Sequence, residues 1–178
     1  MAAEVADEAA RLLRTQFGVE SGRYFTEFVP LPGAPEEPVA ELLQRLRTRA
    51  ANLGVAEAAL DGLVARYGSD ASEVLDLVEE SGRLGACLDD LPYLAAEVAY
   101  AVRNEMALSL EDVLRRRLHV FYEAADGGLS VAPAVARIMA AEPGIGWDDV
   151  EIRAEVERYA AAVRRTHPDA GRTEAADD

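Results

Sequence analysis

The chain has 178 residues, half of them apolar, and a formal net charge of −15, with arginine and two histidines as its only basic side chains. A chain of this length and apolar content can bury a core, so we expect a globular domain with appendages rather than a disordered protein. The acidic balance repels nucleic-acid phosphates and anionic lipids, so we expect no nucleic-acid partner and no direct membrane contact. A single cysteine, Cys87, excludes an internal disulfide and favours a reducing cytoplasm.

The first predicted element is an amphipathic helix that is separate from the others. Val5, Ala9 and Leu12 fall on one helical face, and Gly18 predicts its end. The segment that follows is rich in proline and is predicted to be a linker. Aromatic and β-branched residues near Phe25–Leu31 would allow one short extended segment there, but the prolines exclude a central strand.

Helical periodicity dominates the rest of the chain. Apolar residues recur at intervals of three and four, and glycines or prolines separate the groups. The sequence therefore predicts an all-α fold, an irregular bundle of about seven helices with a Pro-rich linker after the first. We expect residues 1–37 to be a helix and linker, 38–166 the helical domain and 167–178 a disordered acidic tail. The predicted stripes contain Leu42 and Leu46, Leu60 and Val64, Val74 and Val78, Leu94 and Val98, Leu110 to Phe121, Val135 and Met139, and Ile152 to Val163.

The usual catalytic signals are missing from the sequence. His119 and His167 are far apart and lack the spacing of a helical zinc site. Cys87 has no histidine nearby, so we interpret it as a buried or a bystander thiol and not as a nucleophile. No glycine-rich phosphate loop is present, and Gly144–Trp147 is too short for one, so we expect a turn there with the tryptophan in the core.

The most informative segment is the helix predicted over residues 91–107. Tyr93, Glu97, Tyr100 and Asn104 share one face of it, beside an apolar stripe. A face of tyrosines and carboxylates could be a ligand site. The alternative, which we favour, is an inter-helix or inter-domain contact, because ion-pair networks are common outside active sites.

Arginine is the only strong base available to the carboxylates of this segment. We expect the helix to be largely buried, with Glu97 and Glu105 paired to Arg103, Arg116 or Arg117. Ser109–Asp112 resembles a capping box that opens the next helix, with Asp in place of Glu or Gln. The run Arg115–Arg117 is interpreted as a set of ion-pair partners and not as a nucleic-acid contact.

The segment from Leu91 to Ala107 (LPYLAAEVAYAVRNEMA), followed by SLEDVLRRR, resembles a signature of the FAD-dependent glycerol-3-phosphate dehydrogenases. That family has Y-L-x-A-E-V-x-Y-A-V-R-x-E-x-A and then T/S-x-E-D-V-L-x-R-R in its C-terminal helical domain. Arg66-Tyr-Gly68 and the glycine and tryptophan at 146–147 are similar to flanking motifs, and Pro30–Ala34 is similar to the family's inter-domain linker. The resemblance extends over nearly the whole chain.

The resemblance implies a role for the chain within a larger enzyme. The family oxidises sn-glycerol 3-phosphate to dihydroxyacetone phosphate, and its FAD passes electrons to quinone. The flavin and substrate residues lie in parts that this sequence does not contain, so no catalytic, cofactor-binding or metal residue is assigned here. We expect FAD in the parent enzyme only and the flavin domain as partner, and a homo-oligomer stays open. We expect a cytoplasmic location, with the parent peripheral on the inner face of the cell membrane.

The residues that carry the resemblance are assigned a structural or interfacial role. Two functions stay open at this point: a non-catalytic C-terminal domain that packs against a flavin domain, or a free-standing helical protein-interaction domain. Both would use the same signature, which comprises Tyr93, Glu97, Tyr100, Arg103, Glu105, Glu111, Asp112 and Arg116.

Overall fold

The computed structural model describes residues 2–22 and 26–166, and within them the fold is all-α, as predicted. Those ranges contain no β-strand; the only strand-like feature described is an isolated antiparallel bridge between Cys87 and Leu94. The chain divides into two units, Met1–Ala34 and Pro35–Asp178. The acidic tail expected at 167–178 lies outside the described residues. The α-helices are α1 (Ala2–Phe17), α2 (Val39–Asn52), α3 (Glu57–Tyr67), α4 (Ala71–Glu80), α5 (Ala95–Glu105), α6 (Val120–Glu123), α7 (Ala132–Ala140) and α8 (Asp149–Thr166).

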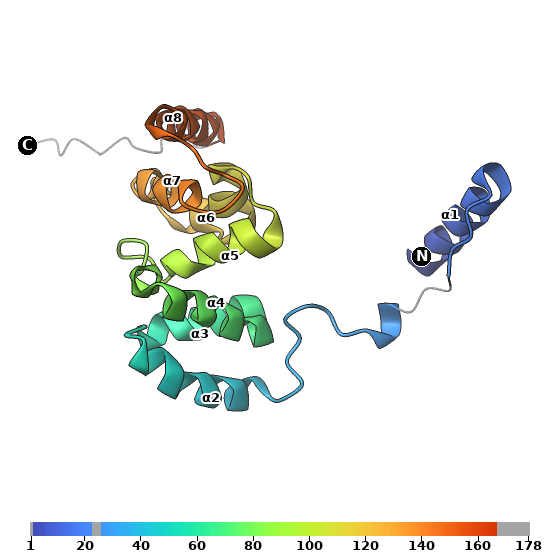
Figure 1. Ribbon diagram of the computed structural model, residues 1–178, viewed down its shortest axis with the longest axis horizontal. Helices are drawn as coiled ribbons and strands as arrows, with labels where there is room; N and C mark the ends of the chain where they lie inside the picture. Colours follow the sequence, from blue (N-terminus) through green and yellow to red (C-terminus); the bar gives the residue numbers. More distant parts are fainter. Residues whose placement is uncertain (1, 23–25, 167–178) are drawn as a thin grey trace, which may run out of the picture. The chain divides into compact units, whose positions relative to one another are not determined.

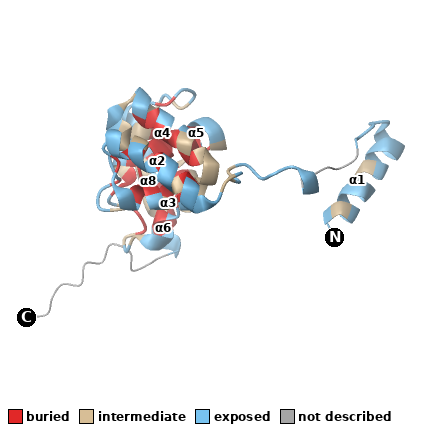
Figure 2. Ribbon diagram, turned by 90° about the horizontal axis from the view of Figure 1, so that it is seen from below, coloured by how far each residue is buried: buried red, intermediate tan, exposed pale blue. Residues whose placement is uncertain are grey.

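The first unit contains α1 and a short 3-10 turn, η1 (Thr26–Phe28). None of the residues of α1 is buried, and Figure 2 shows the helix coloured mostly as exposed. Val5 and Phe17 are 70% and 71% exposed. The apolar face that predicted this helix is therefore not covered by any of the described residues of its own unit, 2–22 and 26–34.

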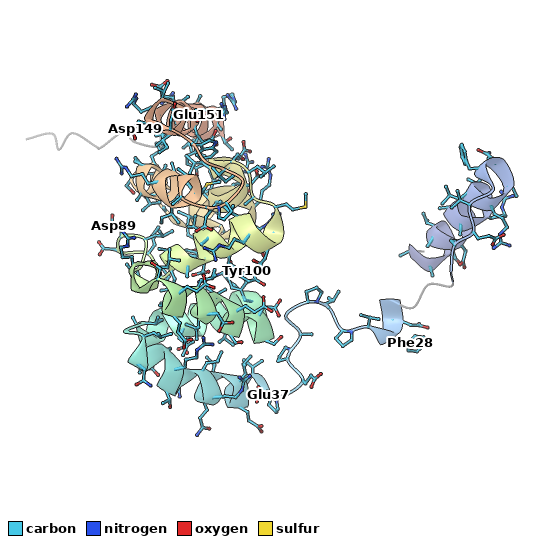
Figure 3. All side chains as sticks on the ribbon, in the orientation of Figure 1. Phe28, Glu37, Asp89, Tyr100, Asp149 and Glu151 are labelled. Atoms are coloured by element: carbon cyan, nitrogen blue, oxygen red, sulfur yellow. The ribbon has the colours of Figure 1, made fainter. Side chains whose placement is uncertain are left out.

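The extended segment considered at Phe25–Leu31 is not formed among the described residues. Thr26–Phe28 is a 3-10 turn, whose Phe28 is labelled in Figure 3. Next, the N–H of Ala34 donates to the carbonyl of Leu31 at 3.0 Å. Pro32 and Gly33 occupy the centre of that turn, and the φ of Gly33 is +77°, which suits a proline–glycine turn. Turn chemistry thus prevails over the local β propensity.

In the second unit the helices stack in chain order from α2 to α8 (Figure 1). Each of α2, α3 and α4 contacts the next helix, α5 follows α4, and α7 lies between α5 and α8. Short connections join neighbours, which is typical of helical bundles. The stack places α5 at its middle.

Helix α5 belongs to two hydrophobic cores. Val98 and Val102 join the core formed with α7 and α8, whereas Ala96 and Tyr100 join the one formed by α2, α3 and α4. Figure 2 shows the buried residues gathered in the interior of the helical stack. Both faces of α5 are covered, so its aromatic-polar stripe is a packing surface. The largely buried helix predicted from the sequence is confirmed.

Two element boundaries differ from prediction. The helix expected from residue 91 begins at Ala95, because the preceding loop is tied into a turn in which Leu88 N–H donates to the Tyr93 carbonyl at 2.7 Å. The helix expected to run from Ser109 to Phe121 is interrupted. It contains a π-helical segment, η4 (Asp112–Arg117), and then His119 adopts a left-handed conformation with φ +60° before α6.

Candidate functional site

The signature residues lie at the middle of the second unit. Tyr93 precedes α5, which carries Glu97, Tyr100, Arg103 and Glu105. The other three follow at the start of the next helix: Glu111, Asp112 and Arg116. The packing of α5 and η4 against their neighbours decides which partners these side chains meet.

Glu97 forms the most deeply buried ion pair of the domain, and its partner is Arg66 of α3. The guanidinium donates from Nε to Oε2 and from Nη2 to Oε1, both at 2.8 Å, and the Glu97 side chain is 0% exposed. The Leu94 N–H also donates to Oε1 at 2.8 Å, which satisfies a free amide at the start of α5. Burial raises the pKa of the Glu97 carboxyl, while Arg66 and the Leu94 N–H lower it in part.

The prediction that Glu97 pairs with Arg103, Arg116 or Arg117 is wrong in its partner. Arg103 is on the other side of α5 and donates to Glu142 at 2.5 Å and to Glu80 at 3.0 Å. Residues 97 and 103 are six apart, which places them on different faces of a helix. The idea that arginine neutralises the helix carboxylates is correct.

Arg66 is held by more than its carboxylate. Its Nη2 also donates to the Pro92 carbonyl at 3.2 Å, and its guanidinium carbon lies 4.3 Å from the centre of the Tyr93 ring. A planar guanidinium that is both hydrogen-bonded in a fork and stacked on an aromatic ring is not replaceable by lysine. The Arg66–Glu97 pair therefore joins α3 to α5 and to the loop before it.

The two signature tyrosines are buried with their hydroxyls satisfied. Tyr93 donates to Glu123 at 2.6 Å, and Tyr100 donates to Glu73 of α4 at 3.2 Å. Burial, with the charge of Glu73, raises the pKa of Tyr100 to about 12. Figure 3 shows Tyr100 inside the helical stack. The ring of Tyr100 meets the edge of Tyr67 with ring centres 5.3 Å apart. Asn104, expected on the same face, is exposed instead.

Glu105 ends α5 beside Arg117. Arg117 Nε lies 3.5 Å from Glu105 Oε2, and Arg117 Nη2 donates to the Glu105 carbonyl at 2.8 Å. Met106 then takes a left-handed conformation with φ +56°. Partial burial raises the pKa of Glu105. The predicted pairing of Glu105 with an arginine of the next helix is confirmed.

Asp112 forms the capping box predicted with Ser109. Its Oδ2 accepts from the Ser109 N–H at 3.1 Å, and the Asp112 N–H donates to Ser109 Oγ at 3.1 Å. Arg116 donates to Asp112 at 2.6 Å and to Glu111 at 3.2 Å. Arg115 also donates to Glu111, at 3.2 Å. The arginines of the run Arg115–Arg117 are therefore ion-pair partners of carboxylates, as expected.

The Asp112→Ala variant is expected to lose about 0.5–2 kcal/mol of stability at neutral pH, as for the loss of a helix cap. Partial burial raises the pKa of Asp112, but bonds from Ser109, Leu108 and Arg116 outweigh it, so the folded pKa lies below the usual 3.8. A lowered folded pKa gives stability that is present above the usual value and lost as the pH falls through the folded value. The difference between parent and variant should therefore shrink below about pH 4.

Urea unfolding between pH 7 and pH 2.5 measures this difference. The matched control is Asp61→Ala, which removes an exposed carboxylate of α3 that has no hydrogen-bond partner in the described part of the chain. The control should track the parent at every pH. An Asp112→Ala deficit that is unchanged at pH 2.5 would contradict this interpretation of the cap.

Three residues of the network were not identified from sequence. Arg66 lies in the Arg66-Tyr-Gly68 motif, which gave no sign of its partner. Glu142 and Glu155 are buried, with 6% and 3% of their surface exposed. Glu155 accepts from the Leu110 N–H at 2.8 Å and from Arg158. A glutamate inside an apolar stripe, as at Glu155 between Ile152 and Tyr159, is the signal that could have identified it.

Two further candidate residues, Cys87 and Trp147, lie outside the contacts described above. Cys87, on the loop between α4 and α5, is exposed, so of the two alternatives, a buried or a bystander thiol, burial is excluded. Trp147 is partly buried against the core of α5, α7 and α8, as expected. Within residues 2–22 and 26–166 no three histidine, cysteine or carboxylate side chains are grouped to hold a metal ion. In the same ranges, no helix is long and apolar enough to cross a membrane.

Comparisons with known proteins agree with the signature. Residues 24–152 match the family described as the C-terminal domain of alpha-glycerophosphate oxidase. Glycerol-3-phosphate dehydrogenase 2 of Mycobacterium tuberculosis is 33% identical over 164 residues, which are 92% of this chain and 27% of the relative. The glycerol-3-phosphate dehydrogenase of Mycobacterium leprae is 34% identical over the same shares. That of Synechocystis is 29% identical over 73% of this chain and 23% of the relative.

The chain thus spans about a quarter of the length of the curated relatives it matches. The match includes α5 and η4, whose carboxylates, tyrosines and arginines hold the stack together. The chain belongs to the family of helical C-terminal domains found in the glycerol-3-phosphate dehydrogenases and alpha-glycerophosphate oxidases.

Proposed function

We propose that the chain is the non-catalytic C-terminal domain of an FAD-dependent glycerol-3-phosphate dehydrogenase. In this proposal, other parts of the enzyme oxidise sn-glycerol 3-phosphate to dihydroxyacetone phosphate, and their FAD passes the electrons to quinone. The chain contributes packing and an interface. The named relatives, which are about four times as long as the match, support the proposal.

The observation that carries the structural role is the internal use of the signature side chains. Glu97 is closed off by Arg66, Arg103 is occupied by two glutamates, and the tyrosine hydroxyls donate to carboxylates. A catalytic acid, base or nucleophile must be within hydrogen-bond reach of a bound substrate. These groups instead meet one another between helices, which favours a scaffold over a reaction centre.

The first unit supports the interface role. Its helix α1 has no buried residue, and Phe28 and Leu31 of the linker are 78% and 80% exposed. Exposed apolar side chains grouped on one face are typical of a protein contact. We assign this face to the flavin-containing part of the enzyme, because the relatives contain about three quarters of their length outside the match.

The isolated chain is expected to bind no FAD and to oxidise no glycerol 3-phosphate. The reason is that its sequence has no G-x-G-x-x-G loop to place backbone amides around a dinucleotide phosphate. Purification with FAD present, followed by an absorbance spectrum and a dye-reduction assay, checks both expectations. A stoichiometric yellow protein with turnover would contradict the non-catalytic assignment, and the internal network would then need a different explanation.

A further inference from the structure

A cavity of about 740 Å³ lies beside the signature residues and shares Arg103 with them. It is bordered by the loop between α4 and α5, by α5 itself and by α7; Asp89 on this loop is labelled in Figure 3. The volume is in the range of pockets that hold a small organic ligand, about 300–1,000 Å³. The wall is partly apolar, with Leu84, Leu88 and Ile138 among its side chains.

Three arginines from three different elements line this cavity: Arg83 of η3 (Gly82–Gly85), Arg103 of α5 and Arg137 of α7. Two carboxylates, Asp89 and Glu142, line it as well. The side chains that line the cavity therefore carry a formal net charge of +1, in a chain whose formal net charge is −15. A local excess of positive charge in such an acidic chain favours an anionic occupant.

Two of the three arginines have no ion-pair partner. Arg103 is engaged by Glu142 and Glu80. Arg83 and Arg137 have no carboxylate within 4.0 Å in the described part of the chain, and Arg137 donates only to the Pro133 carbonyl, at 3.5 Å. Most described arginines are paired. Those without an ion pair are Arg83, Arg137, Arg153, Arg164 and Arg165.

We propose that this cavity binds a small organic anion with an apolar body. Arg83 and Arg137 hold the anionic group, because arginine forms charge-assisted hydrogen bonds with carboxylates and phosphates. Leu84, Leu88 and Ile138 cover the apolar part. This binding is independent of the glycerol 3-phosphate chemistry proposed for the other parts of the enzyme.

The chain contains its own reporter of occupancy. Cys87 lines the same cavity, is exposed, and is the only cysteine of the sequence. A thiol reagent therefore modifies the protein at one position, beside the proposed ligand. An occupant of the cavity should slow that modification, whereas a ligand bound elsewhere should leave it unchanged.

The experiment uses the full chain with octanoate and octyl phosphate as probes, and octanamide as a neutral probe of similar length. Titration calorimetry measures binding, and the rate at which Cys87 reacts with a thiol reagent measures occupancy of the cavity. The variant Arg83→Gln/Arg137→Gln removes both unpaired charges. The matched control is Arg153→Gln, which removes an exposed and equally unpaired arginine of α8 that does not line the cavity.

We expect at least one anionic probe to bind and to slow the modification of Cys87, and the double variant to weaken that binding by at least about tenfold. Arg153→Gln should bind like the parent, and octanamide should bind more weakly than the anions. The comparison of octanoate with octyl phosphate identifies the preferred anionic group. Binding that is equal in the double variant, equal for octanamide, or absent for both anions at millimolar concentration would overturn the proposal. If the double variant does not fold, the parent chain decides. A rate of Cys87 modification that neither anionic probe lowers would then overturn the proposal.

Discussion

Replacing Glu97 or Arg66 by alanine is expected to lower the free energy of unfolding by about 3–5 kcal/mol, because each change leaves an uncompensated charge in the interior. The Glu97 side chain is fully buried and that of Arg66 is 20% exposed, so water reaches neither charge freely. Glu97→Ala also frees the Leu94 N–H at the start of α5. Both variants should therefore destabilise the junction of α3 and α5.

Urea unfolding followed by circular dichroism measures the effect. The matched control is Arg116→Ala, whose side chain is 51% exposed and which pairs with carboxylates of its own helix. An exposed pair of this kind is worth no more than about 1 kcal/mol. The double variant Glu97→Leu/Arg66→Met removes both charges and should be more stable than either alanine variant. Single variants that unfold like the parent would contradict a buried pair.

The second large effect is expected for Gly128→Ala, at the turn before α7. The φ of Gly128 is +81°, a conformation that costs an alanine about 1–2 kcal/mol. A Cβ would also lie 2.9 Å from Val120 Cγ1 and 3.5 Å from the Tyr159 hydroxyl, in a buried position. Overpacking of this kind adds about 1–3 kcal/mol. Together the two costs should markedly lower the urea concentration at which half of the protein is unfolded.

Gly54→Ala separates the two contributions to that cost. Gly54 has a similar φ of +73°, but an added Cβ would meet no atom within 4 Å. The control should therefore show only the backbone cost. Equal losses in the two variants would show that the close approach of Gly128 to Val120 and Tyr159 adds nothing.

The fold class was predictable because the hydrophobic period is helical in nearly every segment. The stripes at Leu42, Val74 and Val135 all lie on helices that bury them, and the glycines and prolines between them mark real ends. The interruption after η4 was not predictable. The N–H of Leu118 donates to the carbonyl of Val113, five residues back, which is the hydrogen bond of a π-helix. The apolar residues through this region keep the spacing of an uninterrupted α-helix, so the break has no signal in the sequence.

The candidate site was predictable in kind and not in pairing. The sequence showed that the carboxylates of α5 need arginine, because no lysine is present. It did not show that α3, which carries Arg66, packs on the side of α5 where Glu97 lies. Nor did it show that Glu80 and Glu142 lie on the side of Arg103. Pairings across helices depend on which faces meet, and spacing within one helix does not contain that information.

We propose that this domain packs against a flavin-containing partner, and its association with that partner is the most direct test. The part of the Mycobacterium tuberculosis relative that this chain does not match serves as the probe, purified with FAD and titrated with the chain during analytical ultracentrifugation. We predict a one-to-one complex, weakened by Val5→Asp/Leu12→Asp on the exposed apolar face of α1 and unaffected by Arg153→Gln. Absence of a complex at tens of micromolar, or equal binding of the α1 variant, would contradict it.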